Sequence, residues 1–206
     1  AQLDADRVGL GSSQYPVVPI TDWLVLRPIK VPEQEFEAVA GQETGAGKVQ
    51  FKALEVNSGR ISRAAQMNAF NSDWFTGAGA DSVQPKAGAR QKVDDTTELA
   101  WEKITSKDGF VDMQSGLGRD YTVGYAWTEF NVPAATDAWL GFGSDDGIKI
   151  WLNGEMIYDK WERRISRVDD DVVALHLKPG ANRLLIKIQN ATGDWSFVYR
   201  VRTKPR

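Results

Sequence analysis

Apolar and polar positions alternate along most of the second half of the chain. From Trp139 to Asp159 the sequence WLGFGSDDGIKIWLNGEMIYD places apolar residues at every second position on both sides of a Ser-Asp-Asp-Gly turn, which is the period of a half-buried strand. Asn153-Gly154 provides a second turn, since both central positions of a tight hairpin favour a positive φ. The pattern predicts three short strands that form an antiparallel meander.

The same signal continues from Glu98 to the C-terminus. Short apolar segments follow one another at close, regular spacing with Gly, Asp, Asn or Pro between them: LAWEKI, FVDM, YTVGYAWTEFNV, AWLGFGS, IKIWLNG, MIYDKW, DVVALHL, NRLLIKIQN and SFVYRVRT. This arrangement is typical of an all-β protein, an antiparallel β-sandwich or jelly roll. A chain of 206 residues fits a single domain of this class.

The first hundred residues carry a weaker pattern. Residues 1–20 are polar and punctuated by Gly, Ser and Pro, which indicates an extended leader or linker ahead of one sandwich domain over 21–206. TDWLVLRPI, from Thr21, predicts a first strand. Residues 31–100 are expected to be a loop-rich embellishment, either part of the sandwich or a flap over one edge. Within it, PEQEFEAVA favours a short helix, VQFKALEV favours a strand with a bulge, and RISRAAQMNAF fits a strand or a short helix.

Composition excludes several classes of function. With 25 basic and 28 acidic residues the net charge is -3, and no basic cluster indicates a nucleic acid or an anionic membrane as partner. The absence of cysteine excludes disulfides and thiolate chemistry, and no apolar run reaches the roughly twenty residues of a membrane span. His176 is the single histidine; the alternation of its strand predicts that it faces solvent.

Eight tryptophans are many for this length, because each large ring has to fill a core or meet a ligand. Strand positions, and therefore packing in the core or between sheets, are predicted for Trp23, Trp139 and Trp151. Trp195, at the turn into the last strand, is predicted to fill the core. Trp101 and Trp127 fit either role.

The remaining tryptophans lie in loops. Trp161 stands in DKWERRISR, a charged segment without apolar neighbours to bury it, and is followed by Arg163 and Arg164. An exposed indole stacks on the C–H face of a pyranose, and a guanidinium donates to hydroxyl, uronate or sulfate groups. These residues are candidates for carbohydrate binding, together with Trp74 in the loop NSDWFTGAGADS. The alternative is a Trp161 packed under its loop, with the arginines paired to the run 169–171.

Two groups of carboxylates are further candidates. Asp145 and Asp146 lie in a tight turn, which suits calcium, a cation with about six to eight oxygen ligands; the alternative is ordinary Asp-Gly turn chemistry. Asp169 and Asp170 precede a strand, where they either bind sugar hydroxyls or keep a sheet edge solvated. Carboxylates occur in many combinations, and no spacing singles out a catalytic acid and base. Catalysis is therefore not predicted.

Three segments carry a resemblance to a known family: WLVLRPI, GSDDGIKIWLNGEMIYDKW and LKPGANRLLIKIQNATGDWSF. They resemble the galactose-binding-like jelly-roll modules of secreted bacterial proteins, with Arg27 where that family usually has Gly. SDDGIKIWLNGEMIYDKW also resembles the PA14 module, a β-sandwich of adhesins, toxins and glycosidases. In the sugar-binding PA14 adhesins, paired aspartates hold a calcium ion that ligates sugar hydroxyls. The resemblance implies that role for Asp145 and Asp146.

The sequence therefore predicts a non-catalytic carbohydrate-binding module of a secreted or surface-exposed bacterial protein, assisted by calcium. Its partners would be a polysaccharide or oligosaccharide and a neighbouring catalytic or anchoring domain, which the module holds against the polymer by raising the effective concentration. Two other functions stay open. One is a structural or protein-interaction β-sandwich, and the other is a polysaccharide lyase or hydrolase on a jelly-roll scaffold.

Overall fold

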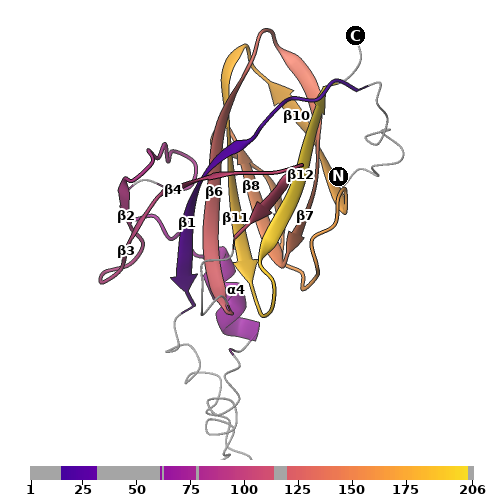
Figure 1. Cartoon of the computed structure of the whole chain (residues 1–206). Coiled ribbons are helices and arrows are strands. Elements are labelled where there is room, and N and C mark those ends of the chain that lie inside the picture. Colours follow the sequence, from indigo (N-terminus) through magenta and orange to yellow (C-terminus); the bar gives the residue numbers. More distant parts are fainter. Residues whose placement is uncertain (1–14, 32–60, 62, 78, 114–119, 204–206) are drawn as a thin grey trace, which may run out of the picture.

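Two antiparallel sheets form a sandwich in the computed structural model, which describes residues 15–31, 61, 63–77, 79–113 and 120–203 (Figure 1). The larger sheet has six strands, in the order β4 (Glu102–Thr105), β1 (Asp22–Lys30), β6 (Thr122–Val132), β11 (Gly180–Asn190), β8 (Gly147–Leu152) and β9 (Glu155–Lys160). The smaller has four, in the order β10 (Asp171–Leu177), β7 (Thr136–Asp145), β12 (Ser196–Thr203) and β5 (Phe110–Asp112). The predicted all-β antiparallel sandwich is confirmed.

A helix and a small hairpin complete the described elements. The helix α4 (Arg63–Asn71) lies in the segment RISRAAQMNAF, which the sequence left between strand and helix. The hairpin pairs β2 (Arg90–Lys92) with β3 (Glu98–Ala100). Among the described residues no helix is long and apolar enough to cross a membrane. The helix predicted over 32–40 and the strand VQFKALEV lie outside the described residues.

The main core lies between the two sheets and follows from the alternation of apolar residues. Its buried members on β11 and on the opposing strand β7 are Leu184, Ile186, Ile188, Ala138, Leu140 and Phe142. Removing each large aliphatic side chain from water contributes about 1.5–3 kcal/mol. Trp23 and Trp195, both expected in the core, are fully buried in the same cluster.

A second apolar cluster lies on the outer face of the larger sheet, opposite the main core. Here Tyr125 of β6 and Leu185 of β11 are packed together with Phe75 and Trp101 from the chain segment between α4 and β4. The rings of Phe75 and Tyr125 are 4.4 Å apart between centroids, and those of Phe75 and Trp101 are stacked at 6.2 Å. The described part of residues 63–101 therefore covers one face of the larger sheet, which is buried on both sides over this area.

The segment 139–159 differs from the predicted meander in its first half. β7 ends at Asp145 and β8 begins at Gly147, yet these strands belong to different sheets. The chain crosses the sandwich here, and no hairpin forms. The alternation of apolar residues does not distinguish a hairpin from a crossing between sheets. In both cases the second strand points its apolar side chains into the same core. The second turn is confirmed: β8 pairs with β9, and Asn153 and Gly154 have positive φ.

The hydroxyl of Tyr199, on β12, ties several segments together inside the main core. It accepts a hydrogen bond from Nε1 of Trp23 on β1 at 3.0 Å and donates one to the carbonyl oxygen of Ile20 at 2.6 Å. The Oγ of Ser106, just after β4, lies 2.6 Å from the same oxygen. One side-chain oxygen thus joins both sheets and the segment that precedes β1.

Substitution Tyr199→Phe is expected to lower the free energy of unfolding by about 1–3 kcal/mol, because the Trp23 N–H and the Ile20 carbonyl are left in the protein interior without this partner. Urea unfolding measures the loss. The control is Tyr121→Phe, since the Tyr121 hydroxyl makes no hydrogen bond to another described residue; its cost should stay within about 0.5 kcal/mol. Equal stability of the two variants would contradict the role of the Tyr199 hydroxyl.

Candidate functional site

Trp127, Leu185 and Trp151 form a row across the outer face of the larger sheet. The strand register places Trp127 of β6 opposite Leu185 of β11, and Leu185 opposite Trp151 of β8. Neighbouring strands are about 4.8 Å apart, so the backbones of the two tryptophans are separated by about 10 Å. Leu185 is buried, whereas both tryptophan side chains are only half-buried. Part of each indole is therefore accessible.

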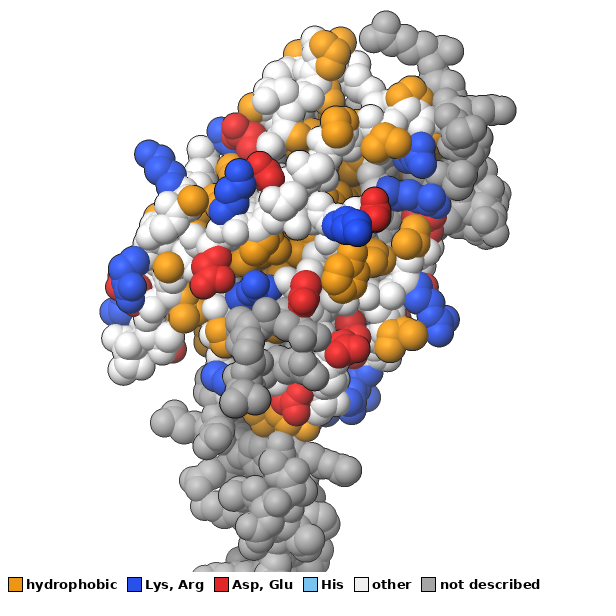
Figure 2. Space-filling model, in the orientation of Figure 1, with side chains coloured by type: hydrophobic (Ala, Val, Ile, Leu, Met, Phe, Trp, Pro, Cys, Tyr) orange, Lys and Arg blue, Asp and Glu red, His pale blue; other side chains and the backbone are white. Residues whose placement is uncertain are grey.

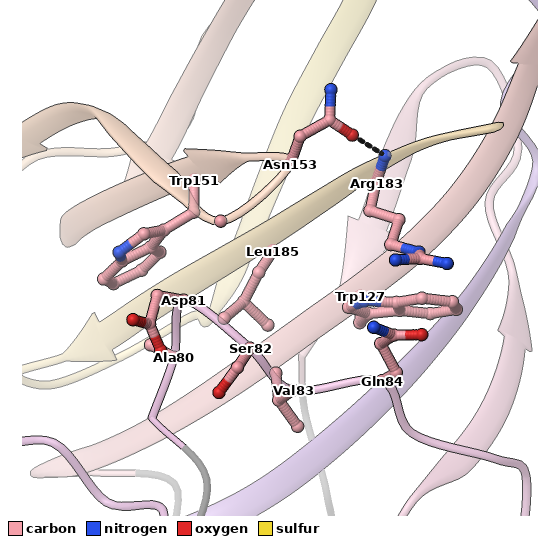
Figure 3. A pocket seen from close by; sticks show the side chains of 11 residues that line it. Ala80, Asp81, Ser82, Val83, Gln84, Trp127, Trp151, Asn153, Arg183 and Leu185 are labelled. Atoms are coloured by element: carbon pink, nitrogen blue, oxygen red, sulfur yellow. Dashed lines mark hydrogen bonds between the residues drawn. The ribbon is translucent and has the colours of Figure 1, made fainter. Parts of the chain in front are cut away.

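The row forms the floor of a cavity of about 290 Å³, which we call the tryptophan cleft. Figure 3 shows Trp151 and Trp127 at its two ends with Leu185 between them. The opposite wall is formed by the segment 80–84, which we call the strap. The other lining residues are Ala80, Asp81, Ser82, Val83, Gln84, Asn153, Gly154 and Arg183.

The polar groups of the cleft have hydrogen-bonding capacity left. The Nε of Arg183 donates to Glu129 at 2.8 Å, which holds the guanidinium in place, while its two terminal nitrogens donate to no other described residue. In Figure 3 the guanidinium and the amide of Gln84 lie on the two sides of the Trp127 ring. The Oδ1 of Asn153 accepts from the backbone N–H of Arg183 at 3.0 Å. A ligand in the cleft would meet N–H donors beside two aromatic surfaces.

The strap owes its position to a glycine and an aspartate. Gly154, in the turn between β8 and β9, has a φ of 92°, and a Cβ at this position would overlap the carbonyl oxygen of Asp81. The Oδ2 of Asp73 accepts from the backbone N–H of Ala80 at 3.2 Å, and its Oδ1 accepts from Phe75 at 3.1 Å. The backbone of the strap can therefore lie directly on the turn, which fixes the width of the cleft.

The helix end before the strap is fixed by a buried lysine of β11. Lys187 is 1% exposed, and its Nζ donates to the carbonyl oxygens of Ala69, Phe70 and Ser72 at 3.0, 2.6 and 2.7 Å. These carbonyls belong to the C-terminal end of α4, where a cation is favourable. Burial, and secondly the ammonium of Lys149, lower the pKa of Lys187 to about 7. The sheet thus anchors α4 and the start of the chain that leads to the strap.

The predicted binding loop around Trp161 is packed onto the protein. The Trp161 ring is half-buried beside Gly147, where an added Cβ would lie 3.0 Å from its Cδ1, and the guanidinium of Arg63 lies 5.7 Å from the ring centroid. Arg163 is exposed and donates to Thr192 at 2.9 Å. Trp161 therefore contacts the protein with part of its ring, and its role in sugar binding stays a prediction.

The charges of this loop are paired within the protein. The guanidinium of Arg164 lies 2.5 Å from a carboxylate oxygen of the fully buried Asp171 and donates to Ser144 at 3.0 Å. Asp169 forms an ion pair with Arg200 of β12. Asp170 is exposed. Of the predicted sugar contacts in this loop, Arg164 and Asp169 are therefore engaged in holding the loop against the smaller sheet.

Asp145 and Asp146 lie where the chain crosses between the sheets. Both oxygens of Asp146 accept backbone N–H groups, from Arg164 at 2.9 Å and from Ala191 at 2.7 Å. Burial raises the pKa of Asp146. Burial, followed by the carboxylates of Asp146 and Asp194, raises the pKa of Asp145 to about 6.

Few carboxylates gather at this crossing among the described residues. No group of three or more His, Asp or Glu side chains among the described residues is placed to hold a metal ion, whereas calcium takes about six to eight oxygen ligands. The oxygens of Asp146 are already used by the protein. Calcium binding stays a prediction from the sequence resemblance.

Trp74 is placed in the second core, away from solvent. It is 8% exposed, and its indole N–H donates to the carbonyl oxygen of Ala69 at 2.9 Å.

The sequence analysis did not identify Trp151 as a candidate, because it assigned this residue to packing in the core or between sheets, and it left the role of Trp127 open. A signal was present: on β11 and β8, Leu185 and Trp151 alternate with the inward-facing residues, so both face outward.

Comparison with known proteins gives partial structural likenesses. No family model matches the chain, and no curated protein matches it in sequence. A β-glucosidase from Kluyveromyces marxianus is 12% identical over 55% of this chain and 15% of that chain, with a TM-score of 0.43. A β-glucuronidase from Ruminococcus gnavus is 19% identical over 50% and 24%, with a TM-score of 0.36. The PA14 domain of the antifreeze protein MpAFP is 15% identical over 38% and 43%, with a TM-score of 0.32. The chain spans less than half the length of each.

Substitution Gly154→Ala is expected to displace the strap and change the tryptophan emission spectrum, because the new Cβ would overlap the Asp81 carbonyl. The control is Gly180→Ala, where φ is 81° and nothing lies within 4 Å of the added atom. Both variants should lose about 1 kcal/mol of stability from the positive φ. Only Gly154→Ala should shift the emission; an identical spectrum for both variants would show that the turn does not position the strap.

Substitution Asp145→Asn is expected to change how stability depends on pH. Because the folded pKa is raised from the ordinary 3.8 to about 6, the folded state binds the proton more tightly, and the wild type loses free energy of unfolding as the pH rises from about 4 to 6. The Asn variant should lack this part of the decline. Urea unfolding between pH 4 and 7 tests it, with Asp95→Asn as the control because the Asp95 side chain is fully exposed.

Parallel profiles for wild type and Asp145→Asn would contradict the burial of this charge. Added calcium tests separately whether Asp145 takes part in binding the ion. A bound ion would raise the melting temperature of the wild type but not that of Asp145→Asn, and a chelator would reverse the effect.

Proposed function

We propose that the tryptophan cleft binds carbohydrate without chemical conversion and that the protein is a polysaccharide- or oligosaccharide-binding module. The observation that carries the proposal is the row of two accessible indoles, on β6 and β8, that floor one cavity beside unused N–H donors. Small-molecule sites combine an apolar floor with a few oriented polar groups. A pyranose has matching features, because its C–H faces are apolar and its rim carries hydroxyl groups.

The polar rim supports a hydroxyl-rich ligand. Arg183 and Gln84 supply guanidinium and amide N–H groups, which donate to sugar hydroxyls and ring oxygens. The amide of Asn153 is already bonded at both ends, to Asn182 and to the backbone of Arg183. The guanidinium also accepts a carboxylate or sulfate in bidentate geometry. On the face seen in Figure 2, Lys and Arg side chains are interspersed with Asp and Glu. This charge pattern favours recognition by local hydrogen bonds over attraction of a polyanion by a basic surface.

Binding fits the cleft better than hydrolysis. Glycoside hydrolysis ordinarily uses two carboxylates that flank the scissile bond. Asp81 is the single carboxylate among the residues that line the cleft. A module with this site would act by holding an attached domain close to a polymer, with modest affinity at a single site.

Substitution Trp151→Ala is expected to weaken polysaccharide binding by tenfold or more, about 1.4 kcal/mol, because the indole borders the cleft floor. Retardation in native gels that contain xylan, mixed-linkage β-glucan or pectin measures the affinity. The matched control is Trp139→Ala, since Trp139 is also half-buried but lies on β7 of the other sheet. It should bind like the wild type.

Trp161→Ala separates the cleft from the loop that the sequence favoured. If the cleft is the site, this variant retains affinity. A loss with Trp161→Ala and none with Trp151→Ala would move the site to the loop and overturn the assignment to the cleft. No retardation of the wild type by any of the three polymers would argue against carbohydrate binding and for a protein-interaction module.

A further inference from the structure

A second cavity, of about 360 Å³, lies on the other side of Trp151. It is lined by residues of the α4 end, of β8 and of β9, among them Asn71, Lys149 and Met156. It shares Ala80, Asp81 and Trp151 with the tryptophan cleft. The two cavities therefore meet at one indole and at the first residues of the strap.

The register extends the row of the cleft toward this second cavity. Met156 of β9 is the partner of Trp151, so the row runs from Trp127 through Leu185 and Trp151 to Met156 across neighbouring strands. With strands about 4.8 Å apart, its length at the backbone is about 14 Å. Met156 is 50% exposed, an unusual position for a large apolar side chain. The row thus presents apolar surface on both sides of Trp151.

The polar walls of the second cavity suit uncharged sugar units. The Nζ of Lys149 lies 2.8 Å from Asp159 and 3.1 Å from the Oδ1 of Asn71, so its charge is balanced by a neighbour. The Nζ of Lys187 donates to three carbonyl oxygens and has no donor left for a ligand. What remains for a ligand is hydrogen bonding at the exposed Asn71 and Ser72 and at the exposed carboxylates of Asp73 and Asp81.

On this basis, and resting on the proposed function, we propose that the ligand is an oligosaccharide segment of at least two units that occupies both cavities, with the linkage between the units against Trp151. One unit lies in the tryptophan cleft between Trp127 and the strap. The next unit lies between Met156 and the end of α4. The module then recognises a length of chain and discriminates against a single sugar, because a monosaccharide fills only one of the two cavities.

Isothermal titration with cello-, xylo- and oligogalacturonide ladders of one to six units tests the inference on the full chain. For the series that binds, affinity should rise at least tenfold between one unit and two or three units and then level off. Met156→Ala should weaken the hexamer severalfold, and Trp127→Ala should do the same from the other cavity. The monosaccharide should respond to only one of these substitutions, since it occupies one cavity.

The control for Met156→Ala is Val168→Ala, which also shortens an exposed apolar side chain, but in the loop around Trp161; it should leave the hexamer affinity unchanged. A monomer that binds as tightly as the hexamer, or a hexamer that is indifferent to Met156→Ala, would overturn the two-cavity inference and leave carbohydrate binding in place. No binding in any ladder or polymer would instead overturn the proposed function itself, and the inference with it.

Discussion

The arrangement of the site depends on one buried lysine. Lys187 stands in the middle of the larger sheet, and burying a charge in this way is costly unless its hydrogen bonds are made. The carbonyl groups at the end of α4 satisfy all its donors, and those carbonyls in turn lack partners within the helix. Each group therefore compensates for the other. The pairing holds the helix end, and with it the chain that becomes the strap, at a fixed place on the sheet.

The candidate site exists because the cover over the larger sheet is incomplete. Tyr125 and Leu185 are buried by the covering residues, whereas Trp127 and Trp151, in the same row as Leu185, are buried only in part. Half-buried tryptophans are ordinary in proteins; these two differ in that they line one cavity beside polar groups. The strap stops over the tryptophans and does not seal them, and the close approach of Gly154 to Asp81 sets how far it stands from the sheet.

The charged loop uses some of its candidate residues to hold itself against the protein. Trp161, Arg164 and Asp169 have the residue types of a sugar site. In the fold Trp161 packs beside Gly147 of β8 and Arg63 of α4, while Arg164 and Asp169 form ion pairs with residues of the smaller sheet. Removing one partner of an ion pair that includes a buried charge, such as Asp171, strongly destabilises the folded protein, because the remaining charge is buried without compensation. Arg164 and Asp170 also border a cavity of about 380 Å³, and their part in sugar binding stays a prediction. The accessible donors belong to Arg183, on a regular strand.

The sequence by itself determined the all-β class, the hairpin at Asn153-Gly154 and the core positions of Trp23 and Trp195, because alternation and turn chemistry are local properties of a strand. The alternating pattern of the sequence also shows that the side chains of Leu185 and Trp151 point away from the main core. Only the tertiary structure decided which sheet each strand joins, which face residues 63–101 cover and which side chains share a row. β6, β8 and β11 are distant in the chain, and apolar alternation fixes the face of each side chain but does not identify the partner strand, which packing across the whole sandwich decides.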